Sequence, residues 1–404
     1  MITMTTNSAI LDFAIIGAGI SGLTLAKNLQ EQGYSVAVFE KARGTGGRLS
    51  SKRVAINRIT TDEQQAYMAF DLGCVSISAQ TETFNQQLKQ WQEEGIVSPW
   101  WQESSVLGNG RIHYVGTPRN SALTRYLSLG IDCYFSTRIH KLEQVNEQGE
   151  DIWLLLSAEE NELEDVNKNT LIAKANKVIL ATPPAQAYDL LPKESVLRKP
   201  LESVDVAPQW VMGIEAEEIP LELPELNILD HKILHSISRE TLKPERAAST
   251  NNILQIQATA EWTNNHLDLS QEQVSQLLTE ELAQYLLHKF DHQLKVVHSY
   301  SHRWLYSRII NKISATDAYL FDGYLFDSAG LGLIGDYFQQ DSSIAEDELR
   351  SSEMNNIEIQ GVESAWLSAQ KLAYSFNKES FNKEPFNKKL LNKKIATSSE
   401  KQQG

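Results

Sequence analysis

Residues 13–40, which read FAIIGAGISGLTLAKNLQEQGYSVAVFE, decide the fold. An apolar run leads into three glycines, Gly17, Gly19 and Gly22, and a helical stretch follows them. Glycines at this spacing allow a tight turn and a close approach of the backbone to a pyrophosphate, whose charge then lies at a helix N-terminus. The stretch therefore predicts a strand–helix–strand unit that binds a dinucleotide.

The second strand of this unit, VAVFE, ends at Glu40. A carboxylate at this position can accept hydrogen bonds from a ribose. We also expect contacts to the cofactor from Ile20 and Ser21, which begin the helix, and from Lys41, which follows the acid. The residues described so far fit NAD and FAD equally well.

A second glycine-rich turn, GTGGR at residues 44–48, distinguishes an FAD site from an NAD site. FAD is the longer molecule, and its two phosphates need a counter-charge on their second side. Arg48 can supply that charge with two parallel hydrogen bonds, and Gly47 helps the turn to fold back over the first one. The alternative is a surface loop with an exposed arginine. Both turns fall where one FAD molecule needs them, so FAD is favoured.

The same segments resemble the renalase-like flavoproteins of the amine oxidase superfamily. Further segments resemble that family in the same order: HYVGTPRNSALTRYLSLGIDCYFSTRIHKLE from His113, KVILATPPAQAYDLL from Lys177, GLIGDYF from Gly332, and GVESAWLSAQKLA from Gly361. The resemblance spans residues 10–375 and implies an α/β fold of the amine oxidase or hydroxybenzoate hydroxylase type.

In this fold an FAD-binding Rossmann-type domain is built from discontinuous segments and carries an α+β substrate domain. We assign residues 10–75, 106–205 and 322–375 to the FAD-binding domain, and residues 76–105 and 206–321 to the substrate domain. Residues 1–9 are expected to form a flexible N-terminus. Residues 376–404 repeat FNKES, FNKEP, FNKKL and LNKKI at a period of five, which keeps no single face on a helix. This tail is expected to be disordered.

The resemblance implies further contacts with FAD. The main chain of Ile139 would meet the adenine, although an ordinary strand residue is the alternative. Gly335 and Asp336 would meet the pyrophosphate and the ribityl chain. Val362 lies at the start of the last helix, whose positive end would face the flavin where negative charge grows on reduction.

The substrate side departs from the family pattern. Where the family usually has DxGAQY, this chain reads DLGCVS at residues 71–76, and YVGTP is followed by Arg119 and Asn120. We place His113, His302 and Trp304 nearest the pocket, each with a structural role as the alternative, and assign no catalytic residue. We expect no metal site, and the sequence shows no Ser–His–acid constellation. This absence does not count against an enzyme, because hydride transfer to a flavin needs little acid–base apparatus.

Composition limits the classes of function. The 404-residue chain is 41% hydrophobic and 22% charged, which indicates a globular protein, and its net charge of −15 disfavours nucleic acid and anionic lipid. We expect a cytoplasmic protein with no transmembrane segment, because no apolar run approaches the length of a membrane span and the first ten residues lack a secretory pattern. Cys74 and Cys133 suggest no disulfide framework, and the absence of a later cysteine favours noncovalent FAD. The mildly basic tail allows a weak contact with an acidic surface.

The sequence therefore predicts an FAD-dependent oxidoreductase that takes a hydride from a small-molecule electron donor to flavin N5. By resemblance, the donor is a dihydro-NAD(P) isomer and O2 is the electron acceptor. The alternatives are a flavin amine oxidase or a desaturase, and, from another class, an FAD-binding protein without turnover. The sequence does not indicate the identity of the substrate, the acceptor or the oligomeric state.

Overall fold

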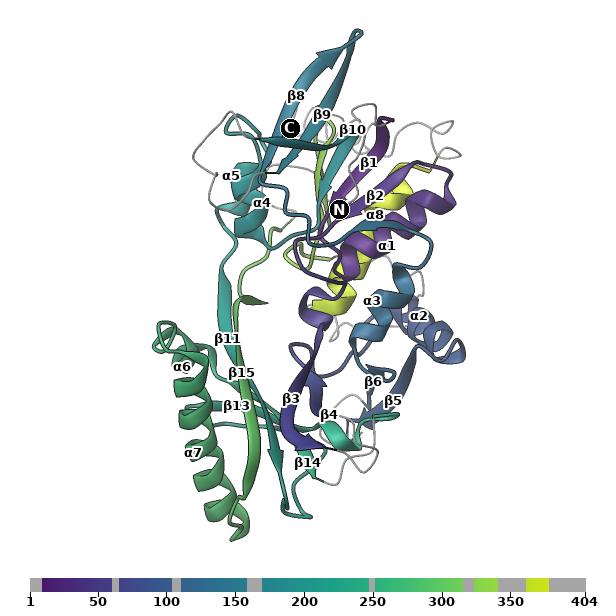
Figure 1. Ribbon diagram of the computed structural model, residues 1–404. Coiled ribbons are helices and arrows are strands. Elements are labelled where there is room, and N and C mark those ends of the chain that lie inside the picture. The colour runs from purple at the N-terminus through teal and green to yellow at the C-terminus, as the bar shows by residue number, and fades with distance from the viewer. Residues whose placement is uncertain are drawn as a thin grey trace, which may run out of the picture.

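The computed structural model describes residues 9–59, 65–103, 110–157, 169–246, 251–314, 323–340 and 361–377. Within them, the two largest of four sheets lie at opposite ends of the molecule (Figure 1). None of the helices in these ranges is both long and apolar enough to cross a membrane. The N-terminal segment 1–8 and the repeats from residue 378 onward lie outside the described residues, so the structure does not test the predictions for them.

The first sheet has a parallel centre that follows from the quoted sequence. β1 (Leu11–Ile16) lies between β2 (Val36–Phe39) and β10 (Thr170–Leu180), β7 (Asp132–Tyr134) pairs with β2, and β17 (Leu331–Leu333) pairs with β10, all in parallel. α1 (Ile20–Glu31) packs beside α8 (Gly361–Ser375). β2 and the carboxyl-terminal parts of β1 and β10 are continuously apolar and buried, because chain covers both faces of the sheet there.

The remaining elements extend this sheet. β8 (Lys141–Glu147) and β9 (Glu150–Ser157) form an antiparallel ribbon joined to the first half of β10, and β16 (Leu325–Phe326) pairs with β17. α4 (Pro184–Leu190) and α5 (Arg198–Leu201) follow β10. The sheet therefore gathers strands from both ends of the chain around β1.

The second sheet is antiparallel and comes from one continuous stretch of chain. Its order is β12 (Leu226–Ile228), β13 (Leu234–Arg239), β14 (Asn252–Ala258), β11 (Val206–Ala216) and β15 (Val296–Ile309). α6 (Ala260–Asn264) and α7 (Gln271–Phe290) cover one face, and α7 begins with a capping box between Ser270 and Gln273. The long strands β11 and β15 run side by side toward the first sheet (Figure 1).

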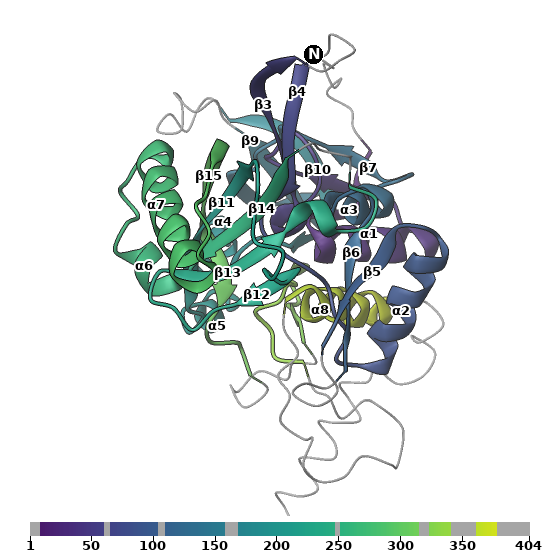
Figure 2. The same ribbon diagram turned by 90° about the horizontal axis from the view of Figure 1, so that it is seen from below.

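Elements between residues 47 and 127 join the two sheets. After the short turn η1 (Gly47–Leu49), the hairpin of β3 (Ser51–Ile59) and β4 (Gln65–Asp71) packs on the face of the second sheet opposite α7. There Phe70 fills the space above Gly213, where a Cβ atom would lie 2.3 Å from the ring. α2 (Glu82–Glu93), β5 (Val97–Gln102), β6 (Ile112–Gly116) and α3 (Ser121–Leu127) follow. Figure 2 shows α2 and α7 on opposite sides of the molecule.

Buried charged residues hold the hairpin to the second sheet. Asp71 Oδ2 lies 3.1 Å from Lys243 Nζ and 2.6 Å from Arg246 Nη2, while Lys243 also pairs with Glu240 of η4 (Glu240–Leu242). All four side chains are at most 6% exposed. The two cations hold the pKa of Asp71 below its ordinary value despite the opposing effect of burial. The network fixes the point at which the chain leaves β4, and removing one member would leave a buried charge without its partner.

The sequence-based division differs from the packing at two places. The segment 76–105 was assigned to the substrate domain, but its Phe84 and Trp91 pack in the core beside α1 and α8. Phe376, which was placed in the tail, is only 7% exposed, and its ring packs edge-on against Phe13 and Phe326 at 4.9 and 5.0 Å. Its carbonyl oxygen accepts a hydrogen bond from Tyr34 Oη at 2.8 Å. The residue begins the five-residue repeat in sequence but completes the apolar core beneath α8.

Candidate dinucleotide and substrate site

A cavity of about 870 Å³ lies between the β1–α1 turn, the turns at residues 46–49 and 73–78, and the end of β15. It brings together residues that are far apart in the sequence. Its lining includes these predicted site residues: Gly17, Gly19, Ile20, Ser21, Glu40, Lys41, Gly47, Arg48, Ile139, His302, Trp304, Gly335, Asp336 and Val362. Gly22 and His113 are the two predicted site residues that do not line it.

The glycines of the first turn have different physical roles. Gly17 has φ +111, and a Cβ atom there would lie 2.7 Å from the carbonyl oxygen of Ala181. At Gly22 a Cβ atom would lie 2.1 Å from the carbonyl oxygen of Gly17, so this glycine permits the turn itself. At Gly19 nothing lies within 4 Å, and that space belongs to the cavity. α1 has no side-chain cap and no acid in its first turn, so its N-terminus offers backbone N–H groups to an anion.

Glu40 stands at the carboxyl end of β2 and is held by the backbone. Its Oε2 accepts from the N–H of Ala18 and its Oε1 from the N–H of Ala42, both at 2.8 Å. Lys41 Nζ donates to Gln186 Oε1 at 3.1 Å. The carboxylate is thereby fixed beside the turn between β1 and α1.

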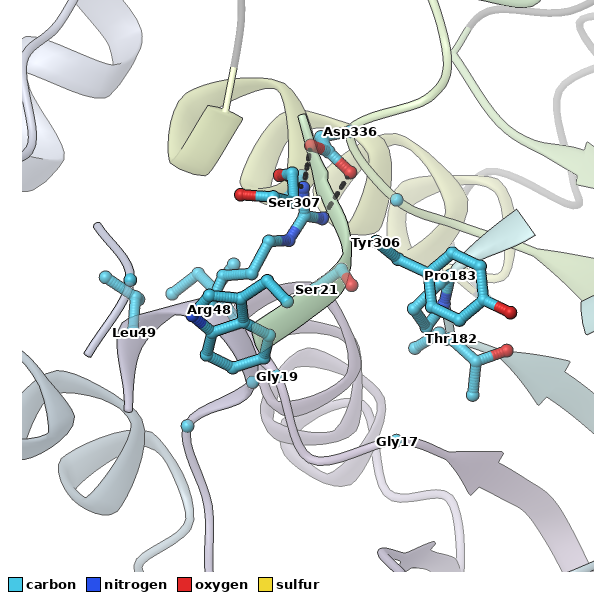
Figure 3. A pocket seen from close by; sticks show the side chains of 18 of the residues that line it. Gly17, Gly19, Ser21, Arg48, Leu49, Thr182, Pro183, Tyr306, Ser307 and Asp336 are labelled. Carbon is cyan, nitrogen blue, oxygen red and sulfur yellow. Dashed lines mark hydrogen bonds and ion pairs between the residues drawn. The ribbon is translucent and has the colours of Figure 1, made fainter. Parts of the chain in front are cut away.

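Arg48 has a protein partner that the sequence analysis did not foresee. Its Nη1 and Nη2 donate to the two carboxylate oxygens of Asp336 at 2.7 and 2.6 Å, and Nη1 also donates to the carbonyl oxygen of Ser307 at 3.1 Å (Figure 3). Burial lowers the pKa of Arg48, but the carboxylate of Asp336 more than reverses this and leaves the pKa raised. The Arg48 side chain remains 36% exposed, while that of Asp336 is 6% exposed. Three of the five guanidinium donors are thus used, and the pair joins the two predicted FAD turns to β15.

The second sheet supplies the opposite wall. In the register of β11 and β15, Gln209 pairs with Trp304 and Val211 with His302, so these side chains share the face turned away from α7. The rings of His302 and Trp304 meet edge-on at 4.8 Å, and Trp304 Nε1 donates to the carbonyl oxygen of Leu72 at 2.9 Å. Burial, with a smaller effect of Lys52, lowers the pKa of His302. A neutral imidazole and an anchored indole therefore line this part of the cavity.

The segment that departs from the family pattern is held rigidly at the cavity. Gln257 Nε2 donates to the carbonyl oxygen of Gly73 at 2.8 Å, and Asn120 Nδ2 donates to that of Cys74 at 2.7 Å. Asn120 is therefore a structural clamp, and Arg119 is not among the lining residues. Burial raises the pKa of the Cys74 thiol to about 11, so this thiol is neutral at physiological pH.

His113 lies behind this segment rather than on the cavity surface. Its Nδ1 is 2.9 Å from Ser76 Oγ, which belongs to a lining residue, and its Nε2 is 3.1 Å from Glu103 Oε1. The sequence analysis recognised no Ser–His–acid arrangement, and the structure brings these three side chains together. The alternation of side chains in β5 and β6 was the available signal, since it puts Glu103 and His113 on one face of their strands.

α8 also borders the cavity and begins at Gly361, whose φ of +61 suits a glycine. Glu363, in the first turn of α8, is 1% exposed and accepts hydrogen bonds from Thr81 Oγ1 and from the backbone N–H groups of Gln80 and Thr81. Burial raises the pKa of this carboxyl group. In the described ranges no three His, Cys, Asp or Glu side chains are grouped as metal ligands.

Comparisons with known proteins agree with the first sheet and its turns. Residues 15–85 match the family model of an NAD(P)-binding Rossmann-like domain. A thiamine thiazole synthase from Solidesulfovibrio magneticus is 36% identical over 63 residues, which are 16% of this chain. The chain spans only 24% of the length of that curated relative. These matches support dinucleotide binding by the N-terminal segment alone.

The whole chain resembles solved oxidase structures. A protein from Exiguobacterium sp. 255-15 assigned as a protoporphyrinogen oxidase has a TM-score of 0.61 at 10% identity, with 92% of this chain and 100% of that chain covered. Cyclohexylamine oxidase from Brevibacterium oxydans IH-35A has a TM-score of 0.61 at 12% identity, with 92% and 99% covered. The chain has an amine oxidase-type fold. The predicted fold class, an α/β protein with a Rossmann-type domain, is confirmed.

Proposed function

We propose that the protein is an FAD-dependent oxidoreductase. The observation that carries this proposal is a single cavity, which joins two glycine turns and the acid of a dinucleotide site to a wall formed by the second sheet. A cavity of this kind would leave space for a small molecule beside one end of the dinucleotide. The length of FAD and the second turn at Arg48 favour FAD over NAD as the resident cofactor.

Each group around the cavity has a role in this proposal. The N-terminus of α1 and the space beside Gly19 receive the pyrophosphate, and Glu40 receives the adenosine ribose. Arg48 keeps donors for a phosphate while Asp336 holds it in place. When bound, FAD would accept a hydride at N5. His302, Trp304 and the turn at residues 73–78 orient the donor and exclude water.

Resemblance to the renalase-like flavoproteins makes a dihydro-NAD(P) isomer the first donor to test, with O2 as the acceptor and hydrogen peroxide as the product. An amine donor is the second candidate, and the likeness of the fold to cyclohexylamine oxidase favours testing it. FAD is proposed to be held noncovalently. Neither Cys74 nor Cys133 lies in the last third of the chain, where a cysteinyl attachment would be expected.

The test begins with the purified protein, which should be yellow and should release intact FAD on heat denaturation. Anaerobic screening with dihydronicotinamide isomers and amines should then bleach the flavin with one class of donor. Readmission of air with formation of hydrogen peroxide would support an oxidase. A protein that binds FAD but is bleached by no donor would favour a binding protein without turnover. A colourless protein that cannot be reconstituted with FAD would refute the proposal.

A further inference from the structure

Three side chains form a chain of hydrogen bonds from the cavity wall toward solvent. Ser76 lines the cavity, His113 stands behind it, and Glu103 follows, with contacts of 2.9 and 3.1 Å. The side chains of His113 and Glu103 are 15% and 18% exposed. The order hydroxyl, imidazole, carboxylate is that of catalytic triads, which are recognised by geometry and role rather than by sequence position.

The backbone explains how these residues meet. Ile77 and Tyr114 exchange hydrogen bonds of 2.8 and 2.7 Å, which sets the turn at residues 73–78 beside β6. In β5 and β6, Trp101 pairs with His113, and their rings lie 4.8 Å apart. Glu103 is two residues beyond Trp101, so it lies on the same face of its strand. The imidazole is therefore held between the hydroxyl and the carboxylate by packing as well as by hydrogen bonds.

The chemistry of the partners fixes the direction of the hydrogen bonds. An ionised carboxylate only accepts, so His113 Nε2 carries the proton that points to Glu103. In a neutral imidazole Nδ1 is then the acceptor, and Ser76 Oγ donates to it. Arg111 Nε lies 3.4 Å from Glu103 Oε2, so a cation also faces that carboxylate. If Ser76 accepts a proton from the cavity, its own proton can pass to His113, and the carboxylate of Glu103 stabilises the resulting imidazolium.

We propose that Ser76, His113 and Glu103 accept a proton from a nitrogen or oxygen atom of the donor while that donor is oxidised. This inference rests on the proposed oxidoreductase, and among its candidate donors it favours the amine, together with alcohols, over the dihydronicotinamide. The N–H or O–H bond of the donor breaks, its proton goes to Ser76 Oγ, and the original proton of Ser76 goes to His113 Nδ1. The adjacent carbon gives its hydride to bound FAD, so the donor loses two electrons and FAD gains them. An amine or an alcohol loses both a proton and a hydride, whereas a dihydronicotinamide loses only the hydride.

The first test needs no turnover. In full-length protein labelled with ¹⁵N-histidine, spectra should show the neutral form of His113 with its proton on Nε2, and His113→Gln identifies the signal by its loss. Ser76→Ala should move the Nδ1 resonance of His113, because Nδ1 loses its donor. Glu103→Gln should spread the proton over both nitrogens. A proton on Nδ1 in the wild type, or a signal unaffected by both substitutions, would overturn the relay.

The second test measures anaerobic flavin reduction by cyclohexylamine, benzyl alcohol and a dihydronicotinamide isomer. Loss of a positioned general base costs about 10²-fold or more, so Ser76→Ala and His113→Gln should slow reduction by the amine or alcohol about 100-fold. Ser76→Thr, which keeps a hydroxyl group, should restore much of the rate. Ser98→Ala, in β5 and away from the cavity, is the control and should match the wild type.

Three outcomes of this second test would contradict the inference. These are wild-type rates in Ser76→Ala with an amine or alcohol, reduction by dihydronicotinamide alone, and covalent labelling of Ser76 by a fluorophosphonate, which would indicate a hydrolytic nucleophile. A protein that binds no FAD would instead refute the proposed function. The histidine spectra would then still report whether the hydrogen-bond chain exists.

Discussion

Replacing Arg48 with alanine should lower both the stability of the apoprotein and its affinity for FAD, and the two effects can be measured separately. The side chain donates two hydrogen bonds to Asp336 and one to Ser307, so its loss leaves the carboxylate of Asp336, 6% exposed, without its counter-ion. Removing one partner of a buried ion pair costs about 3–5 kcal/mol. Because Arg48 is itself 36% exposed, water screens part of that loss, and we expect about 2–3 kcal/mol in the unfolding free energy of the apoprotein.

FAD affinity should fall in addition, because phosphate oxygens would lose a charged donor. A loss of about 2–4 kcal/mol corresponds to a Kd about 30- to 1000-fold higher. Arg48→Lys should recover only part of it, since lysine cannot form two parallel hydrogen bonds. Unfolding in urea and quenching of FAD fluorescence on reconstitution measure the two quantities separately.

The double variant Arg48→Ala/Asp336→Asn decides between the two roles of the arginine. It removes the unpaired carboxylate and should restore most of the unfolding free energy without restoring FAD affinity. Arg43→Ala, an exposed arginine of the same loop, is the matched control and should change neither. If the double variant bound FAD with the Kd of the wild type, Arg48 would be a purely structural residue and the assignment to the phosphates would be wrong.

Three further predictions concern other parts of the chain. Gly19→Ala should lower FAD affinity and keep the apoprotein fold, because its Cβ enters only open space, whereas Gly22→Ala should disrupt the turn itself. Circular dichroism and FAD titration distinguish the two variants, and equal behaviour would contradict this account of the turn. Truncation after Asn377 should leave flavin content and melting temperature unchanged, while truncation after Ser375 removes a buried phenylalanine and should cost about 3–5 kcal/mol, measurable by denaturant unfolding. Because burial raises the pKa of Cys74 to about 11, its thiol should react with iodoacetamide at least about 100-fold more slowly at pH 8 than an ordinary thiol. The reaction rate should increase as the pH rises toward 11. Rapid labelling at pH 8 would show that the pKa of this thiol is not raised.

Local signals carried most of what the sequence could predict. The glycine turn, Glu40 and the capping box at Ser270 depend on residues within one or two elements, and the structure has all three. The pair of Arg48 and Asp336 spans 288 positions, and no periodicity connects residues that far apart. Both had been linked to the cofactor, but their contact with each other depends on how the two sheets meet.

The substrate side was harder to predict for a related reason. His113 was placed near the pocket, yet it reaches the cavity only through Ser76, because a strand presents alternate residues to opposite faces and the sequence does not say which face is covered. For the same reason the contact between Glu103 and His113 was not predicted. Phe376 was misassigned because the repeat begins with it, and its burial beside Phe13 depends on packing between the two ends of the chain.

The order of the elements along the chain bears on its synthesis. β1 and α1 leave the ribosome long before β17 and α8, which complete the sheet and cover α1. The strands of the second sheet arrive together between residues 206 and 309, so that sheet has all its partners earlier. Domains tend to fold as units during synthesis. The β1–α1 unit can complete its packing only after β17 and α8 have been synthesised. A nascent chain that stops before α8 would retain every glycine of the first turn and still leave the apolar face of α1 uncovered, a state prone to aggregation and to capture by chaperones.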